Sequence, residues 1–291
     1  MVERYSLCLN IEELKKIECN RILLQFPEGI KAKIIRICEE IKKITNAEVI
    51  LSGDVCYGAC DIRINEAKLM NCDLIIHIGH SDFGVHSDIP VIYIPIKFKV
   101  KLSKKLREDL SKIEDKNIGI FTSEPYNNLL KDLEELYKDR RIVEKKIIFG
   151  CYDDKYYNKR DAAIFIGSGK FHPLCLRGKV YFCDIERNRL VVLDTKKEEM
   201  KKYARIQKLK EAERVGILIS SKLGQYYGDF VELKSKLEKS GKYAEIIIMD
   251  EITDDKLIGM NFDMFINTAC PRILDNKFTK PIINLRDIDL W

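Results

Sequence analysis

The sequence lacks any run of about 18 consecutive apolar residues, so an ordinary transmembrane helix is not expected. Its first residues, MVERYSLCLNIEELKKIE, carry no signal-peptide pattern. The formal net charge is only +5 over 291 residues, and it does not favour nucleic acid as a partner. We therefore expect a cytoplasmic protein without membrane contact and without direct nucleic-acid contact.

Common catalytic motifs are also missing. There is no HExxH helix, no Ser–His–Asp order and no clustered pair of carboxylates, so hydrolysis has no positive support. The ten cysteines form no compact CxxC…CxxC signature, and a disulfide framework is not expected in a reducing compartment. Cys56 and Cys60 form a C-x3-C pair, but Arg63 stands where a CxxxCxxC cluster motif has its third cysteine. Cys56 is either an alternative ligand or a loop residue packed against its neighbours.

What the sequence does contain is one plan repeated three times. Apolar runs rich in β-branched residues alternate with amphipathic helical patterns. Short, continuous apolar strands of this kind are typical of parallel sheets covered on both faces. The expected strands are residues 21–26, 48–51, 73–78 and 91–94, then 117–121, 145–149, 161–166 and 180–182, and finally 215–220, 245–249, 262–266 and 281–284.

The first helix of each copy carries one apolar stripe. Its positions are Ile30, Ile34, Ile37, Ile41 and Ile44 in the first copy, Leu129, Leu133 and Leu136 in the second, and Phe230, Leu233 and Leu237 in the third. The charged, glycine-poor joins at 101–116 and 195–214 predict solvated helices. We expect an α/β protein of three similar small domains, each a parallel sheet with flanking helices, at residues 1–105, 106–208 and 209–291. One large doubly wound sheet is the alternative.

Three cysteines occupy matching places in these copies. In open parallel sheets, functional residues gather outside the carboxyl ends of the strands. Cys151 and Cys270 reach that edge directly, and Cys60 reaches it from the loop after a second strand. Thiolates suit iron–sulfur clusters and zinc, and three of them leave one position of a four-iron cluster open. Burial as small apolar residues is the alternative, and it fits Cys38 and Cys72.

Other candidates follow the third strands, namely His80, Gly167, Ser168, Gly169, Lys170, His172 and Arg272. The glycine-containing tetrapeptide could hold an anion with its backbone N–H groups, or it could be a plain turn. The two histidines could bind a substrate or relay a proton, and the arginine could pair with a carboxylate. Simple solvation is the competing explanation for all three. His77, within its strand, is expected to be a hydrogen-bonded core residue.

The loops together resemble one family. GDVCYGACD at 53–61, FGCYDD at 149–154, FIGSGKFHP at 165–173 and NTACPRI at 267–273 occur in one order. In this combination the chain is similar to the archaeal 2-(3-amino-3-carboxypropyl)histidine synthase family, which starts diphthamide biosynthesis. The resemblance spans nearly the whole chain. It implies three α/β domains in a pseudo-threefold arrangement around a 4Fe-4S cluster, with Cys60, Cys151 and Cys270 as the metal ligands.

The resemblance also implies an activity. Members of the family transfer the 3-amino-3-carboxypropyl group of S-adenosylmethionine to an imidazole carbon of one histidine in elongation factor 2. An electron from the reduced cluster breaks the sulfur–Cγ bond, so a radical transferase is implied. The implied partners are elongation factor 2, a second copy of the chain in a homodimer and an unidentified electron donor. Beyond the cluster, no catalytic residue is indicated.

Two other functions stay open at this point. A quinolinate-synthase-like 4Fe-4S dehydratase would also join three domains around a cluster with three cysteine ligands, and it would use the open iron as a Lewis acid. A non-catalytic, metal-stabilised scaffold subunit would need the cysteines for folding alone. The two enzymes differ in whether S-adenosylmethionine is consumed, and the metal content separates both from the scaffold.

Overall fold

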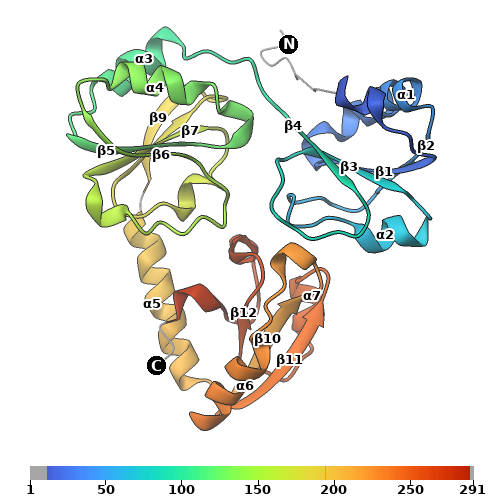
Figure 1. Ribbon diagram of the computed structural model, residues 1–291. Coiled ribbons are helices and arrows are strands. Elements are labelled where there is room, and N and C mark those ends of the chain that lie inside the picture. Colours follow the sequence, from blue (N-terminus) through green and yellow to red (C-terminus); the bar gives the residue numbers. More distant parts are fainter. Residues whose placement is uncertain (1–11, 194, 289–291) are drawn as a thin grey trace. The chain divides into compact units, whose positions relative to one another are not determined.

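The computed structural model describes residues 12–193 and 195–288 (Figure 1). Contacts divide the chain into two compact units: unit 1 contains the described residues up to Lys99 together with Lys222–Gly224, and unit 2 contains Val100–Ser221 and the described residues from Gln225 onward. No helix within the described ranges is long and apolar enough to span a bilayer. Short 3₁₀ helices lie at Glu12–Lys16, Glu28–Lys33, Glu124–Tyr126, Tyr157–Lys159, Pro173–Cys175, Leu223–Gln225, Pro271–Asp275 and Leu285–Asp287.

The sheet of unit 1 has parallel strands in the order β2-β1-β3-β4. Alternate residues of β1 face opposite sides: Leu24 packs with the apolar stripe of α1, and Leu23 packs with residues of α2. This sheet confirms the predicted strands to within one residue. The elements are β1 (Arg21–Gln25), α1 (Ile34–Thr45), β2 (Glu48–Leu51), α2 (Ile64–Leu69), β3 (Leu74–Gly79) and β4 (Val91–Pro95).

Unit 2 begins with a five-stranded sheet in the order β6-β5-β7-β8-β9. Phe121 and Phe165, on its two central strands, are fully buried. The predicted helices at 101–116 and around Leu129 are confirmed. The elements are α3 (Lys104–Ser111), β5 (Asn117–Thr122), α4 (Leu129–Leu136), β6 (Arg141–Ile147), β7 (Ala162–Gly167), β8 (Val180–Asp184) and β9 (Arg189–Leu193).

Two strands of this sheet differ from the sequence prediction, and both lie at its edges. β6 was predicted at 145–149, but it begins at Arg141 and ends at Ile147. An edge strand need not be apolar throughout, and the charged residues 144–146 interrupt the apolar pattern of β6, so its start at Arg141 gave no signal. β9 was not predicted, and it pairs antiparallel with β8 although the sheet is otherwise parallel. Only Leu193 of β9 is buried, which explains the weak pattern.

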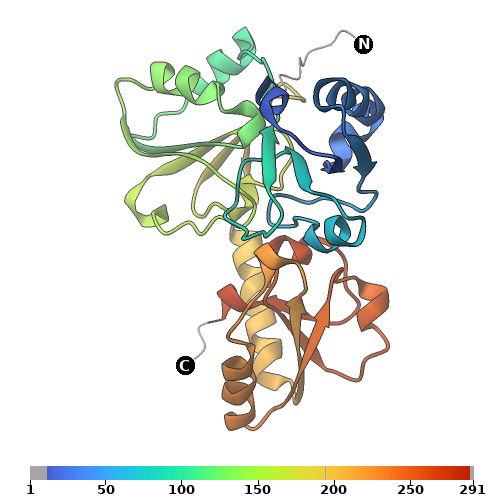
Figure 2. The same cartoon turned by 45° about the vertical axis from the view of Figure 1, so that its right-hand side comes forward.

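The third sheet, also in unit 2, has parallel strands in the order β11-β10-β12-β13. Its strands are confirmed to within two residues. Ile206 and Leu209 of α5 pack into the core of this sheet, so the predicted boundary between residues 208 and 209 falls within that helix (Figure 2). The elements are α5 (Thr195–Glu211), β10 (Arg214–Ser220), α6 (Phe230–Lys239), β11 (Tyr243–Met249), α7 (Asp254–Leu257), β12 (Met264–Asn267) and β13 (Ile282–Asn284).

The three copies share a hydrogen-bonding device as well as a strand order. An aspartate directly before the third strand of each copy accepts hydrogen bonds from backbone N–H groups at the start of the first strand. The three carboxylates belong to Asp73, which is 2.8 Å from Asn20 N, Asp161, which is 2.8 Å from Asn117 N, and Asp263, which is 2.8 Å from Arg214 N. The repeat inferred from apolar periodicity is therefore also present in polar detail.

Candidate functional site

Two of the three predicted cysteine ligands lie in unit 2, where they influence one another electrostatically. Cys151 follows β6 and is exposed, and Cys270 follows β12 and is partly buried. Burial raises the pKa of the Cys270 thiol, and a charge on Cys151 raises it further, which reflects their proximity. The backbone N–H of Arg272 and the guanidinium groups of Arg272 and Arg286 lower that pKa. These cations favour the thiolate form, which is the form that binds a metal.

Arg286 is a residue that the sequence reasoning missed. Arg286 lies on the short helix after β13, and its guanidinium is 3.4 Å from the backbone oxygen of Cys151. The sequence predictions place functional residues only after the second and third strands of each copy. Extending them to the fourth strand would have found this arginine.

Arg272 is not the solvated surface residue that was the alternative explanation. Its side chain is only 9% exposed and pairs with Asp275. Its guanidinium carbon lies 5.0 Å from the centre of the Phe171 ring, a cation–π arrangement. Phe171 was not singled out from the sequence, yet it connects the loop after β7 with the loop after β12.

Gly150 allows this close packing beside Cys151. A Cβ atom at Gly150 would lie 2.9 Å from Cγ of Arg272 and closer still to the Phe171 ring. Only glycine fits there without moving an aromatic ring and a buried arginine. The Gly-Cys order at 150–151 therefore has a steric reason.

Replacing Gly150 by alanine is expected to destabilise the chain by about 1–3 kcal/mol, because the added methyl group overpacks the contact between Phe171 and Arg272. Urea unfolding followed by circular dichroism measures the change. Gly53→Ala is the control, since a Cβ at Gly53 meets nothing within 4 Å. Equal stability of the two variants would show that the Gly150 contact is not a tight one.

The loop after β7 places the other predicted residues of unit 2. Gly169 adopts a positive φ of 67°, a conformation that favours glycine, and Lys170 is exposed. The His172 ring stacks on Phe165, with centroids 6.2 Å apart, and meets the edge of Phe171 at 5.0 Å. His172 is thus part of an aromatic layer and is not simply solvated.

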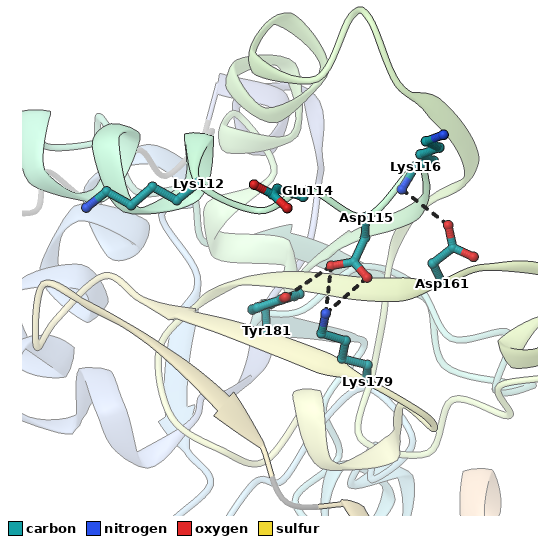
Figure 3. Close-up of a pocket in the computed structure, with 7 residues that line it drawn as sticks. All are labelled: Lys112, Glu114, Asp115, Lys116, Asp161, Lys179 and Tyr181. Atoms are coloured by element: carbon teal, nitrogen blue, oxygen red, sulfur yellow. Dashed lines mark hydrogen bonds and ion pairs between the residues drawn. The ribbon is translucent and has the colours of Figure 1, made fainter.

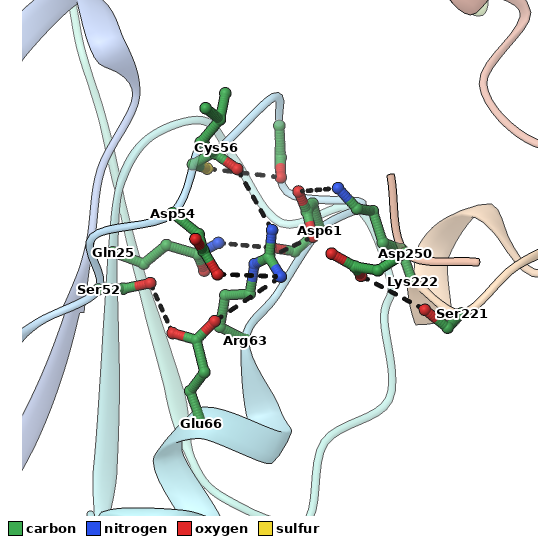
Figure 4. Close-up of polar contacts among 12 residues, drawn as sticks. Gln25, Ser52, Asp54, Cys56, Asp61, Arg63, Glu66, Ser221, Lys222 and Asp250 are labelled. Carbon is green, nitrogen blue, oxygen red and sulfur yellow. Dashed lines mark hydrogen bonds and ion pairs between the residues drawn. The ribbon is translucent and has the colours of Figure 1, made fainter. Parts of the chain in front are cut away.

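Cys60 lies in unit 1, on a loop fixed by charged groups (Figure 4). The centre of this network is Arg63, whose side chain is 11% exposed and lies 3.4 Å from Asp61 and 3.7 Å from Glu66. Asp61 also pairs with Lys222 at 3.1 Å, and its backbone oxygen accepts a hydrogen bond from Gln25. Arg63, which occupies the place of the third cysteine of a CxxxCxxC motif, is therefore the central residue of an ion-pair network.

His77 and His80 lie at the carboxyl end of β3 in the same unit. His77 is fully buried and its Nδ1 is 3.2 Å from Oε1 of Gln25, so the prediction of a hydrogen-bonded core residue is confirmed. His80 is half-buried, and its Nδ1 is 3.0 Å from Nε2 of His77. Simple solvation therefore does not describe His80.

A polar pocket of about 490 Å³ lies elsewhere, at the amino ends of strands β5, β7 and β8 (Figure 3). It contains none of the predicted site residues. Asp115 pairs with Lys179 at 2.9 Å and accepts a hydrogen bond from Tyr181 at 3.0 Å, so these charges already satisfy one another. The lining residues are Lys112, Glu114, Asp115, Lys116, Asp161, Lys179 and Tyr181.

Comparison with solved structures defines the class of protein. The fold matches the crystal structure of Dph2 from Pyrococcus horikoshii with a TM-score of 0.86 and 29% sequence identity, covering 96% of this chain and 90% of that chain. The crystal structure of the same protein with a 4Fe-4S cluster matches with a TM-score of 0.85 and 28% identity, covering 98% and 93%. This chain is therefore an α/β protein of the Dph2 type.

The sequence comparisons identify the family. A family model described as "Putative diphthamide synthesis protein" matches residues 26–290, and the chain belongs to this family. The 2-(3-amino-3-carboxypropyl)histidine synthase of Pyrococcus horikoshii is 30% identical over 96% of this chain and 88% of its own length. The synthase of Methanocaldococcus jannaschii is 31% identical over 97% and 87%. The resemblance noted from the four loops is thereby confirmed.

Proposed function

We propose that this protein is a 2-(3-amino-3-carboxypropyl)histidine synthase. It transfers the 3-amino-3-carboxypropyl group of S-adenosylmethionine to an imidazole carbon of one histidine in elongation factor 2, the first step of diphthamide biosynthesis. The observation that carries the proposal is the similarity to curated synthases over almost the entire length of both chains. The same family membership argues against the dehydratase and scaffold alternatives.

We further propose that Cys60, Cys151 and Cys270 hold a 4Fe-4S cluster. The donor set fits: all three are cysteine side chains on loops that follow strands, and a protein of the same fold has been solved with such a cluster. Three ligands leave one iron accessible to S-adenosylmethionine. When bound and reduced, the cluster supplies the electron that breaks the sulfur–Cγ bond, so the transfer is a radical reaction.

The residues around Cys151 and Cys270 give the proposal further support. Arg272 and Arg286 place positive charge beside these thiols, which suits both thiolate ligands and the carboxylate of S-adenosylmethionine. We assign Arg272 and the loop of Gly167, Ser168, Gly169 and Lys170 to binding of the aminocarboxypropyl group. His80 and His172 are assigned as neighbours of cofactor or substrate. Together, these residues orient the sulfonium of S-adenosylmethionine so that only one of its three carbon–sulfur bonds reacts.

We also propose an oligomeric state, a cellular location, protein partners and a division into domains. The chain acts as a homodimer in the cytoplasm, with an electron donor and elongation factor 2 as protein partners. The three repeated sheets correspond to three domains, predicted at residues 1–105, 106–208 and 209–291. Because α5 packs on the third sheet, the last boundary moves from 208/209 to the start of that helix. The repeated strand order and the repeated aspartate device support this division.

Anaerobic turnover tests the proposed function directly. Iron-loaded protein, a reductant, S-adenosylmethionine and archaeal elongation factor 2 are expected to yield methylthioadenosine and one modified histidine, detected by mass spectrometry. Elongation factor 2 with its acceptor histidine replaced is the control, and it should remain unmodified. Release of 5′-deoxyadenosine in place of methylthioadenosine would mean that a different carbon–sulfur bond breaks and would overturn the assignment.

A further inference from the structure

We propose that Cys56, His77 and His80 form a second metal site, a mononuclear one for a divalent cation such as Zn²⁺. One ligand atom from each residue, the Cys56 Sγ and a ring nitrogen of each histidine, lies within 4.8 Å of the others. All three residues belong to unit 1. None of them is among the three cysteines assigned to the cluster, so this site is additional to the cluster. With the cation bound, His80 is a ligand of the second site, and His172 remains the histidine assigned beside cofactor or substrate.

The hydrogen bonds around His77 leave the correct nitrogen available. Nε2 of Gln25 donates to the backbone oxygen of Asp61 at 2.5 Å, which turns Oε1 of Gln25 toward Nδ1 of His77 at 3.2 Å. His77 therefore carries its proton on Nδ1, and its Nε2 presents a lone pair. A histidine that binds a metal usually donates its other ring N–H to an oxygen acceptor, and Oε1 of Gln25 is the acceptor here.

The lone pair of His77 points at a second potential ligand. Its Nε2 lies 3.0 Å from Nδ1 of His80. Without a cation, a single proton on His80 joins the two rings. When a divalent cation takes its place, this proton moves to Nε2 of His80 by exchange with solvent, and the ring stays neutral. Both facing nitrogens then present lone pairs to the cation, and a small turn of the half-buried His80 ring opens the space between them.

Burial keeps the ligands in suitable chemical states. Burial, and then the neighbouring His80, lower the pKa of His77 to about 3, so this ring stays neutral at physiological pH. Burial, and then Asp61, raise the pKa of the Cys56 thiol to about 12 in the absence of a cation. A bound cation displaces the thiol proton into solvent, and the charge of the new thiolate is then compensated.

The donor set defines the class of ligand. Thiolates and imidazoles are both zinc ligands, and a site built from them also accepts cobalt as a spectroscopic substitute. The consequence would be structural: Cys56 lies four residues before Cys60 on the loop after β2, whereas His77 and His80 lie at the end of β3. A cation here would fasten the loop that carries Cys60 to its sheet.

The test uses a full-length variant in which Cys60, Cys151 and Cys270 are all replaced by alanine, so that no cluster interferes. Anaerobic titration with Co²⁺ is expected to saturate at one ion per chain, with a thiolate-to-cobalt charge-transfer band and the visible bands of four-coordinate Co²⁺. Zn²⁺ should displace the cobalt. Adding Cys56→Ala should abolish the charge-transfer band. Gln25→Leu should weaken binding by about 10–100-fold, because it removes the acceptor for His77.

Cys72→Ala is the matched control, since Cys72 is buried in the same unit but lies outside the proposed site. It should leave cobalt binding unchanged, and circular dichroism confirms that each variant is folded. A folded parent variant without the cobalt bands, or bands that survive Cys56→Ala, would overturn the proposal and leave an ordinary hydrogen-bonded histidine pair. Either result leaves the proposed transferase intact, because turnover depends on the other three cysteines.

Discussion

Replacing any one of Cys60, Cys151 and Cys270 by alanine is expected to remove most of the iron and to lower methylthioadenosine release by more than about 100-fold. A cluster ligand contributes directly to metal binding, and even supporting residues around a metal cost about 10–100-fold when they are removed. Iron content after anaerobic purification, the visible absorption of the cluster and the rate of methylthioadenosine release are the three measurements. The loss should be similar for all three variants.

Cys175 provides a sharp control for this prediction. It interacts electrostatically with Cys151, but its thiol lies 2.9 Å from the backbone oxygen of His172 and donates to it. Cys175→Ala should therefore keep its iron. Loss of iron in Cys175→Ala together with its retention in Cys151→Ala would show that the ligand set is wrong.

Cys56→Ala tests the first ligand in the same experiment. Because Cys56 points toward His77 and His80, we expect this variant to keep the brown colour that Cys60→Ala loses. The two cysteines of the C-x3-C pair would then have separate roles. A colourless Cys56→Ala protein with a brown Cys60→Ala protein would show that Cys56, and not Cys60, is the cluster ligand.

The central strands could be predicted from the sequence because their burial leaves a direct record. In β7 and β12 every residue is buried, so both strands appear as continuous apolar runs. The edge strands β6 and β9 are mostly exposed or half-buried, and pairing rather than composition defines them. Prediction of these strands from the sequence failed for a physical reason. An edge strand pairs on one side only, so its residues can be charged and leave no apolar run.

The candidate site could be predicted to the level of loops but not of contacts. The rule that functional residues gather at the carboxyl ends of parallel strands predicted a role for both Cys151 and Cys270. In unit 2 a charge on Cys151 affects the pKa of Cys270. The packing of Arg272 on Phe171 joins the segments that follow two different strands, β12 and β7, so no local spacing records it. The same is true of Arg63, which contacts Asp61 and Glu66 nearby but also depends on how the loop after β2 folds back.

The largest effect on stability is expected at the buried pair of Asp154 and Arg160. Their side chains are 0% and 1% exposed, and the guanidinium contacts both carboxylate oxygens, one of them at 2.9 Å. Asp154 also accepts a hydrogen bond from the backbone N–H of Arg177 at 2.7 Å. Removing Asp154 leaves the buried Arg160 with only Glu144, 3.6 Å from its guanidinium, as a counter-charge. Asp154→Ala should therefore cost about 3 kcal/mol, the low end of the range for a broken buried pair.

The neighbouring aspartate supplies the control, because both belong to the FGCYDD loop that carries Cys151. Asp153 is 56% exposed and lies 3.7 Å from Lys155, so Asp153→Ala should change stability by less than about 1 kcal/mol. Urea unfolding of the two variants under identical conditions measures the difference. Since Asp154 ties this loop to Arg160 and Arg177, Asp154→Ala should also load less iron than Asp153→Ala. Equal unfolding midpoints would mean that the pair contributes little, and a lower midpoint for Asp153→Ala would show that the exposed carboxylate is the structural one.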